Sequence, residues 1–357
     1  MEQIRALCPA DADAVLTLWI GCLNRGEVLY RTPEREDFLA RFFAPGCQGF
    51  VAEVEGRVAG WAHCVCPQRF LPGETADNTP LFLTLVMTAP ELRGQGIGTA
   101  LVARVLAHGR VQGKRQVVVS GNNPVHLTWL IPGAGGHDHN NAPGVWEDSE
   151  GFRFLAHLGF HDDFHEISMY MPMKEYRWDP ALNDKLAALD AEGIRVGRWE
   201  PGLGEAYDGM CDRVGSEYWR NVLRQELHAW HTGQPNADPE LWPDGIRPAG
   251  PRPLLTATHG PDIIGFTGPV DLQRSGRGWF TGICTDPDWG GRGIASVLFN
   301  LLMKEFADEG AAFCSLFTGA ENHAQKIYLR AGLRITSRWA VMSLPLTEGV
   351  SCTQKYF

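Results

Sequence analysis

The sequence has no apolar run long enough to cross a membrane as a helix. Its longest such runs, for example LFLTLVM at 81–87, have the length of strands, whereas a spanning helix needs about 20 apolar residues. The opening MEQIRALCPADADAV has an early acid and lacks the basic and then apolar pattern of a secretory signal. We therefore expect a cytoplasmic protein with no membrane partner.

An excess of positive charge is also missing. The chain has 32 Lys and Arg against 42 Asp and Glu, which gives a formal net charge of -10. Proteins that bind nucleic acid neutralise its phosphates with clustered Lys and Arg. This balance argues against a nucleic-acid partner, and a small molecule is the expected one.

Cysteine and histidine patterns typical of metal sites are absent as well. The nine cysteines are scattered, and the only close pair, Cys64 and Cys66, has one residue between them rather than two. We expect free thiols that are mostly buried. The HDH motif at 137–139 lies in a Gly-, Pro- and Asn-rich stretch that predicts a solvated loop, so no bound metal is expected.

The chain does contain one pattern of elements twice, within 357 residues that are enough for two domains. GRVAGWAHC at 56–64 and GPDIIGFTG at 260–268 each predict a hairpin turn followed by an apolar strand. A strand, a glycine-rich turn, a helix and another strand follow in both halves, before the closing strands EISMYMPM and RWAVMSLPL. This order indicates a duplicated domain. The predicted division is a first domain over 1–173, a linker over 174–192 with a short central helix, a second domain over 193–347 and a tail over 348–357.

Two segments break the symmetry of the halves, and such insertions often shape binding sites. The first half has a long loop near 122–148. The second half has SEYWRNVLRQELHAWHTG, which predicts a helix that ends at Gly233.

The glycine-rich turn is the most informative feature of each half. ELRGQGIGTA at 91–100 and DWGGRGIASV at 288–297 each follow a strand and begin a helix. Free backbone amides at a helix start, next to glycines, form a site for phosphate groups. Both turns lack the Lys of a P-loop, and the third glycine of a dinucleotide-binding motif is replaced by Thr99 and by Ser296. Apolar residues then recur at helical spacing, at Ile97, Ala100, Leu101 and Val105 and at Ile294, Val297, Leu298, Leu301 and Leu302.

Both glycine-rich turns fit a third kind of phosphate-binding turn, other than the P-loop and the dinucleotide-binding motif. TAPELRGQGIGTAL and TDPDWGGRGIASVL follow the pattern [QR]-x-x-G-x-[GA] after a strand that ends near a proline, although Gly290 replaces the Arg or Gln in the second. This pattern resembles the coenzyme A pyrophosphate loop of the GNAT superfamily of N-acyltransferases, here as a tandem pair. The resemblance implies an α/β fold of two domains, each a central twisted mixed sheet flanked by helices, with acetyl-CoA as cosubstrate and no metal.

The resemblance also implies which residues hold acetyl-CoA. Backbone amides of each turn would bind the pyrophosphate, and the strand end before it would pair with the pantetheine arm and polarise the thioester carbonyl. Arg292 is a candidate to supply the charge that Gly290 lacks, and Asn322, or Glu321 by strict spacing, would contact the coenzyme. The implied binding residues are Met87, Thr88, Arg93, Gly94, Gln95, Gly96, Ile97, Gly98, Thr99, Cys284, Thr285, Gly290, Gly291, Arg292, Gly293, Ile294, Ala295, Ser296 and Asn322.

In many members of the superfamily a tyrosine after the fifth strand returns a proton to the leaving thiolate. Counting four residues back from the glycine that follows gives Tyr328 in the second half and Leu155 in the first. The resemblance therefore implies Tyr328 as the catalytic acid and the C-terminal domain as the catalyst. The base stays open among Glu321, which is our candidate, Asp286, Glu217, His323 and a water chain.

Together these patterns predict an N-acetyltransferase that transfers the acetyl group to a primary amine of a small molecule in a ternary complex. We expect a monomer or a homodimer. Two alternatives remain open: a non-catalytic module that binds or senses acyl-CoA, and an enzyme whose N-terminal domain is the catalytic one.

Overall fold

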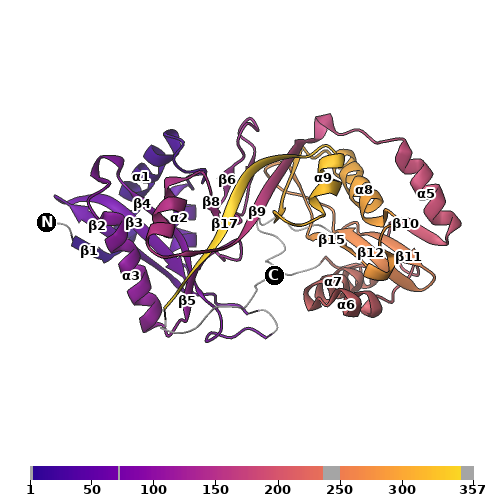
Figure 1. The fold of residues 1–357 in the computed structure, drawn as a ribbon, viewed down its shortest axis with the longest axis horizontal. Coiled ribbons are helices and arrows are strands. Elements are labelled where there is room, and N and C mark those ends of the chain that lie inside the picture. Colours follow the sequence, from indigo (N-terminus) through magenta and orange to yellow (C-terminus); the bar gives the residue numbers. More distant parts are fainter. Residues whose placement is uncertain (1–2, 71–72, 236–249, 347–357) are drawn as a thin grey trace. The chain divides into compact units, whose positions relative to one another are not determined.

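The structure is a computed structural model that describes residues 3–70, 73–235 and 250–346, so the predicted tail over 348–357 lies outside it. The chain forms two compact units (Figure 1). Within the described ranges, no helix has both the length and the apolar character needed to cross a membrane. Unit 1 comprises Met1–Ser168, Gly319–Glu321 and Ser337–Phe357, and unit 2 comprises Met169–Thr318 and Asn322–Thr336.

Unit 1 is built on a mixed sheet in the order β1-β2-β3-β4-β5-β17, in which β4 and β5 are parallel and the other neighbours are antiparallel. Its helices are α1 (Ala12–Asn24), α2 (Arg35–Phe42), α3 (Ile97–Val111) and α4 (Glu150–His157). Its main strands are β1 (Gln3–Ala6), β2 (Cys47–Val54), β3 (Arg57–Val65), β4 (Leu81–Thr88), β5 (Gln116–Val119) and part of β17 (Arg334–Pro345).

Unit 2 contains an antiparallel sheet in the order β10-β11-β12-β15, and a smaller group in which β14 pairs with β13 and β16. The strand predicted before the second glycine turn is divided in the structure between β14 and β15. Its helices are α5 (Ala181–Ala191), α6 (Asp208–Val214), α7 (Glu217–Thr232), α8 (Ile294–Asp308) and α9 (Gln325–Arg330). Its strands are β10 (Ile194–Arg198), β11 (Leu255–His259), β12 (Asp262–Gly268), β13 (Asp271–Leu272), β14 (Arg277–Trp279), β15 (Gly282–Thr285) and β16 (Phe313–Gly319).

A glycine followed by an aromatic residue in the third strand of each repeat explains how the sheets are covered. A Cβ atom at Gly60 would lie 3.1 Å from Leu101 of α3, so the glycine allows the helix to pack closely on this face. Trp61 points to the opposite face and packs against Trp19 of α1, with ring centroids 5.7 Å apart. Gly265 and Phe266 repeat this arrangement in unit 2, where α8 covers one face and α6 and α7 cover the other.

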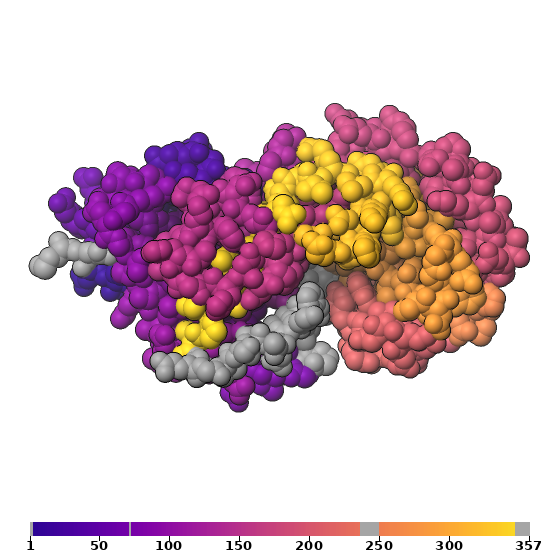
Figure 2. Space-filling model, viewed as in Figure 1, coloured from indigo at the N-terminus to yellow at the C-terminus, as the bar shows by residue number. Residues whose placement is uncertain are grey.

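The closing strand of each repeat crosses from one compact unit into the other. Residues of β17 from Ser337 onward belong to unit 1, where Met342 is paired with Val119 of β5. Residues of β9 (His161–Pro172) from Met169 onward belong to unit 2, where the ring of Tyr170 lies 5.9 Å from that of Phe313. Yellow atoms from the C-terminal part of the chain, which includes β17, are visible among the magenta atoms of unit 1 (Figure 2). The compact units therefore differ from the sequence repeats: the second repeat gives most of β17 to unit 1, and the first repeat gives the end of β9 to unit 2.

The two insertions adopt different structures. The predicted helix of the second half is α7, which Ser216 caps at its start and Gly233 ends in a left-handed conformation. The predicted loop of the first half contains β6 (Trp129–Leu130), β7 (Asp138–His139) and β8 (Val145–Trp146). The expectation of a solvated HDH segment is wrong for His139, since its ring stacks on Trp129 and is only 4% exposed.

Candidate functional site

The two glycine turns have the same backbone path. The first residue of each turn is extended, with φ and ψ of -68° and 161° at Arg93 and of -60° and 157° at Gly290. Gly96 and Gly293, the N-caps of α3 and α8, have positive φ values of 87° and 81°. A Cβ atom at either position would meet nothing within 4 Å, so space does not require glycine there. The positive φ does, because residues with a Cβ atom rarely adopt it. The loss of Arg or Gln at Gly290 therefore leaves the turn geometry intact.

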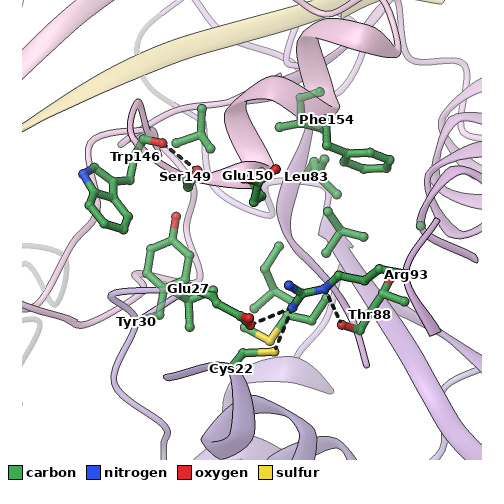
Figure 3. A pocket seen from close by; sticks show the side chains of 18 of the residues that line it. Cys22, Glu27, Tyr30, Leu83, Thr88, Arg93, Trp146, Ser149, Glu150 and Phe154 are labelled. Atoms are coloured by element: carbon green, nitrogen blue, oxygen red, sulfur yellow. Dashed lines mark hydrogen bonds and ion pairs between the residues drawn. The ribbon is translucent and has the colours of Figure 1, made fainter. Parts of the chain in front are cut away.

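A cavity of about 760 Å³ opens in unit 1 where β4 and β5 diverge (Figure 3). The parallel ladder between these strands joins only 81–82 to 117–118. From Leu83 to Thr88 the strand β4 lines the cavity instead of pairing with β5. The glycine turn, the segment 27–30 after α1 and the start of α4 complete the wall. The glycine turn and a free strand edge thus meet in one space.

A buried hydrogen-bond network around Thr84 holds β4 in place where it lines the cavity. Thr84 is the extra residue of a β-bulge opposite His63 and Cys64. The carbonyl of Phe42 can only accept, so His63 donates to it from Nε2 (3.2 Å) and accepts from the Thr84 hydroxyl at Nδ1 (3.0 Å). Asn123 Nδ2 donates to Thr84 Oγ1 at 3.2 Å. Burial lowers the pKa of His63 to about 3, so the ring stays neutral and the network holds the bulge.

The side chain of Arg93 lies in the cavity wall, as predicted for a binding residue, but with partners that the sequence does not indicate. Its Nε donates to the carbonyl of Thr88 (3.2 Å), and Nη2 donates to Glu27 Oε2 (2.7 Å) (Figure 3). The guanidinium lowers the pKa of the Glu27 carboxyl. Glu27 has no motif around it, and only the structure brings it to the glycine turn.

Aromatic side chains pack in the corresponding region of unit 2. A Cβ atom at Gly282 of β15 would lie 2.3 Å from the ring of Trp219, so the indole covers this strand. The ring of Phe280, between β14 and β15, lies 6.1 Å from those of Phe299 and Phe306. Cys284, predicted to face the pantetheine arm, is buried with 6% exposure.

Arg292 and Asn322 have local partners in the structure. Arg292 Nε donates to Glu192 Oε2 at 3.2 Å, and its guanidinium lies 5.1 Å above the ring of Trp289. The charge predicted to assist the second turn is therefore already paired with a carboxylate. Asn322 Nδ2 donates to Thr318 Oγ1 at 3.0 Å, and its Oδ1 accepts from the Ala324 amide just before α9.

The predicted catalytic pair, Tyr328 and Glu321, is not brought together within one unit. Tyr328 belongs to unit 2, where its ring packs 4.7 Å from that of Phe299 and is 6% exposed. Burial raises the pKa of Tyr328 to about 12, so the phenol is protonated at neutral pH. Glu321 has an exposed side chain and is grouped with unit 1. Their roles stay predictions.

Among the alternative bases, Asp286 has an evident structural role. Its fully buried carboxylate accepts from Arg213 Nε at 2.9 Å and Nη2 at 2.5 Å, and from the Asp288 amide at 3.1 Å. The guanidinium holds the pKa of Asp286 below its usual range. Glu217 is exposed and bonded to Arg220, and His323 is exposed.

We expect Asp286→Asn to lower the free energy of unfolding of unit 2 by roughly 2 kcal/mol, since charged hydrogen bonds are lost. A carboxyl whose folded-state pKa is lowered adds stability above its unfolded pKa, near 4, and this stability is lost as the pH falls. Urea unfolding at pH 7 and pH 3 measures both effects. A variant as stable as the wild type at pH 7 would contradict this structural role.

The fold and the site together define a class of protein: two compact units with sheets flanked by helices, each with a glycine turn at a helix start, and a cavity at a strand fork in unit 1. The sequence profile of the acetyltransferase (GNAT) family matches residues 13–127 and 217–333. The chain therefore belongs to the GNAT acetyltransferase family, and it contains two copies of the domain.

Solved structures show the same tandem fold. The glucosamine N-acetyltransferase region of a fungal multi-domain GH3 β-N-acetylglucosaminidase matches at 16% identity with a TM-score of 0.64, over 96% of this chain and 38% of that one. A GCN5-related N-acetyltransferase from Sphaerobacter thermophilus matches at 19% identity and a TM-score of 0.57, over 99% and 98% of the two chains. A tandem GNAT protein from the clavulanic acid biosynthesis pathway matches at 15% identity with a TM-score of 0.55, over 98% of this chain and 100% of that one. No curated protein matches the sequence significantly.

Proposed function

We propose that the protein is an N-acetyltransferase that transfers the acetyl group of acetyl-CoA to a primary amine of a small molecule. The observation that carries the proposal is the cavity of about 760 Å³ in unit 1, with the glycine turn in its wall. Its position favours the N-terminal unit as the site of acetyl-CoA binding and catalysis. We further propose that the protein acts in the cytoplasm as a monomer or homodimer, without a nucleic-acid or membrane partner.

The residues of the cavity fit acetyl-CoA as a substrate. The first amides of α3, at 97–99, have no acceptor within their helix, which suits a pyrophosphate. The β4 edge from Leu83 to Thr88 offers backbone groups to the amides of the pantetheine arm. Phosphate recognition and strand pairing are thus available at neighbouring positions.

The reaction needs the acceptor amine to reach the thioester in the same space. An ammonium loses a proton, its nitrogen attacks the thioester carbon, and the C–S bond breaks as the thiolate takes up a proton. The segment 27–30 and Trp146 line the cavity together with β4. The cavity of about 760 Å³ is larger than an acetyl group, so the thioester and the amine can meet in it. This supports direct transfer in a ternary complex.

Release of free thiol from acetyl-CoA across a panel of small amines tests the proposal. We expect at least one amine to accelerate release, and we expect Tyr328→Phe to retain turnover within about twofold, because Tyr328 belongs to unit 2. A loss of about 100-fold or more in Tyr328→Phe would return catalysis to the C-terminal domain. Coenzyme A binding without amine-dependent release would favour the non-catalytic module.

A further inference from the structure

The segment after α1 brings a second tyrosine to the cavity of unit 1. Tyr30 lines the cavity with its neighbours in the segment 27–30. Backbone hydrogen bonds of 2.8 Å on both sides of Tyr30 tie this segment to 128–130. The indole of Trp19 donates to the Tyr30 carbonyl at 3.0 Å. These bonds fix the position from which the phenol ring enters the cavity.

The hydroxyl of Tyr30 is only loosely held. It donates to the carbonyl of Gly144 over 3.4 Å, whereas hydroxyl hydrogen bonds are usually about 2.7 Å long. Figure 3 shows this hydroxyl turned toward the end of α4 that carries Ser149 and Glu150. Burial raises the pKa of Tyr30 above its usual range, so the group keeps its proton at neutral pH. The phenol can therefore turn its proton to another acceptor in the cavity.

Other side chains of the wall are less suited to give a proton. Leu155 of α4, which lines this cavity, stands where the second repeat has Tyr328. The Ser149 hydroxyl already donates to the Trp146 carbonyl at 2.6 Å and caps α4. The thiol of Cys22 lies 3.8 Å from the Arg93 guanidinium and is buried. Unit 1 thus lacks a tyrosine on α4 but has one on the facing segment.

We propose that Tyr30 is the catalytic acid of unit 1, which gives its hydroxyl proton to the leaving thiolate of coenzyme A. This assignment rests on the proposed function. The amine nitrogen forms the C–N bond, the electron pair of the broken C–S bond goes to sulfur, and sulfur takes the Tyr30 proton. The proton that the nitrogen loses then restores the phenol. The products are the amide and the free thiol, and no other reactant is required.

The test compares Tyr30→Phe with Tyr218→Phe in the full-length protein, using an amine that the wild type acetylates. We expect kcat of Tyr30→Phe to fall about 100-fold, within the range for loss of general acid catalysis. The Kd for coenzyme A, measured by calorimetry, should stay within twofold of the wild type, since the change removes one oxygen from a loosely held group. Tyr218→Phe, at an exposed tyrosine of α7 in unit 2, is the matched control and should change neither quantity.

Three results would overturn the assignment. One is a Tyr30→Phe variant that keeps more than half of the wild-type kcat. Another is a fall in kcat together with a comparable rise in the Kd for coenzyme A, because the hydroxyl would then position the donor rather than protonate the thiolate. The third is a wild type that no amine accelerates although it binds coenzyme A, which removes the proposed function as well. The first two leave the proposed function intact.

Discussion

A Gly96→Glu variant is expected to bind coenzyme A about 100-fold more weakly than the wild type, equivalent to about 2.8 kcal/mol of binding free energy. Gly96 caps α3 with a φ of 87°, a conformation that disfavours any residue with a Cβ atom. The added carboxylate would also stand beside the amides proposed to bind the pyrophosphate, where like charges repel strongly. Isothermal titration with coenzyme A measures the change.

Gly293→Glu is the matched control for this experiment. Gly293 caps α8 with a φ of 81°, so the substitution imposes the same backbone strain and the same charge on unit 2. If acetyl-CoA binds in unit 1, Gly293→Glu should retain the wild-type affinity and turnover. Loss of binding in Gly293→Glu with retention in Gly96→Glu would assign the coenzyme to the C-terminal unit and contradict the proposed site.

Replacing Trp339 with alanine should destabilise unit 1 by about 4 kcal/mol, the usual cost of removing a fully buried indole. Trp339 is 0% exposed, its Nε1 donates to Ser168 Oγ at 3.0 Å, and its ring lies 4.8 Å from that of Trp129. It also lines the cavity. Urea unfolding followed by tryptophan fluorescence, in parallel with coenzyme A titration, measures stability and binding.

The Trp339→Ala variant tests which compact unit loses stability. Trp339 belongs to the second sequence repeat but to the first compact unit. The variant should therefore lose coenzyme A binding with the unfolding of unit 1, while the unfolding transition of unit 2 persists. Trp339→Phe should lose less stability, since much of the ring packing is retained. A variant that unfolds unit 2 first would contradict the assignment of the closing strand.

The glycine turns could be predicted from the sequence because their geometry is local. Positive φ at Gly96 and Gly293 and the helices that follow depend on neighbouring residues alone, and spacing predicts both. The hairpin and apolar strand at 56–64 and at 260–268 were also predicted, whereas the structure shows which helices cover each face. These features were sufficient to indicate the fold and the family.

Glu27 and Tyr30 could not be identified in the same way. They reach the cavity because the segment after α1 pairs with 128–130, and these contacts join residues far apart in the chain. No spacing rule relates the two segments. The same holds for the cavity itself, since the apolar pattern of 81–88 does not tell where β4 stops pairing with β5. Predictions of Tyr328 and Glu321 rested on counting from a motif, which carries no information on which side chains share a cavity.

The exchange of closing strands also has no signature in the local pattern. RWAVMSLPL predicts a strand from its composition, but composition does not identify the strand with which it pairs. The partner is selected by the ladder with β5, from Met342 facing Val119 to Pro345 facing Gln116. Sequence repeats and compact units coincide only when each repeat keeps all of its strands.

The exchanged strand sets the order in which the protein can be completed during synthesis. β5 (Gln116–Val119) is synthesised long before its partner β17 (Arg334–Pro345). Until β17 is made, the edge of β5 offers unpaired backbone groups, which are prone to aggregation. The sheet of unit 1 is therefore complete only after a strand of the second repeat has joined it, so the first repeat alone lacks one strand of its own sheet.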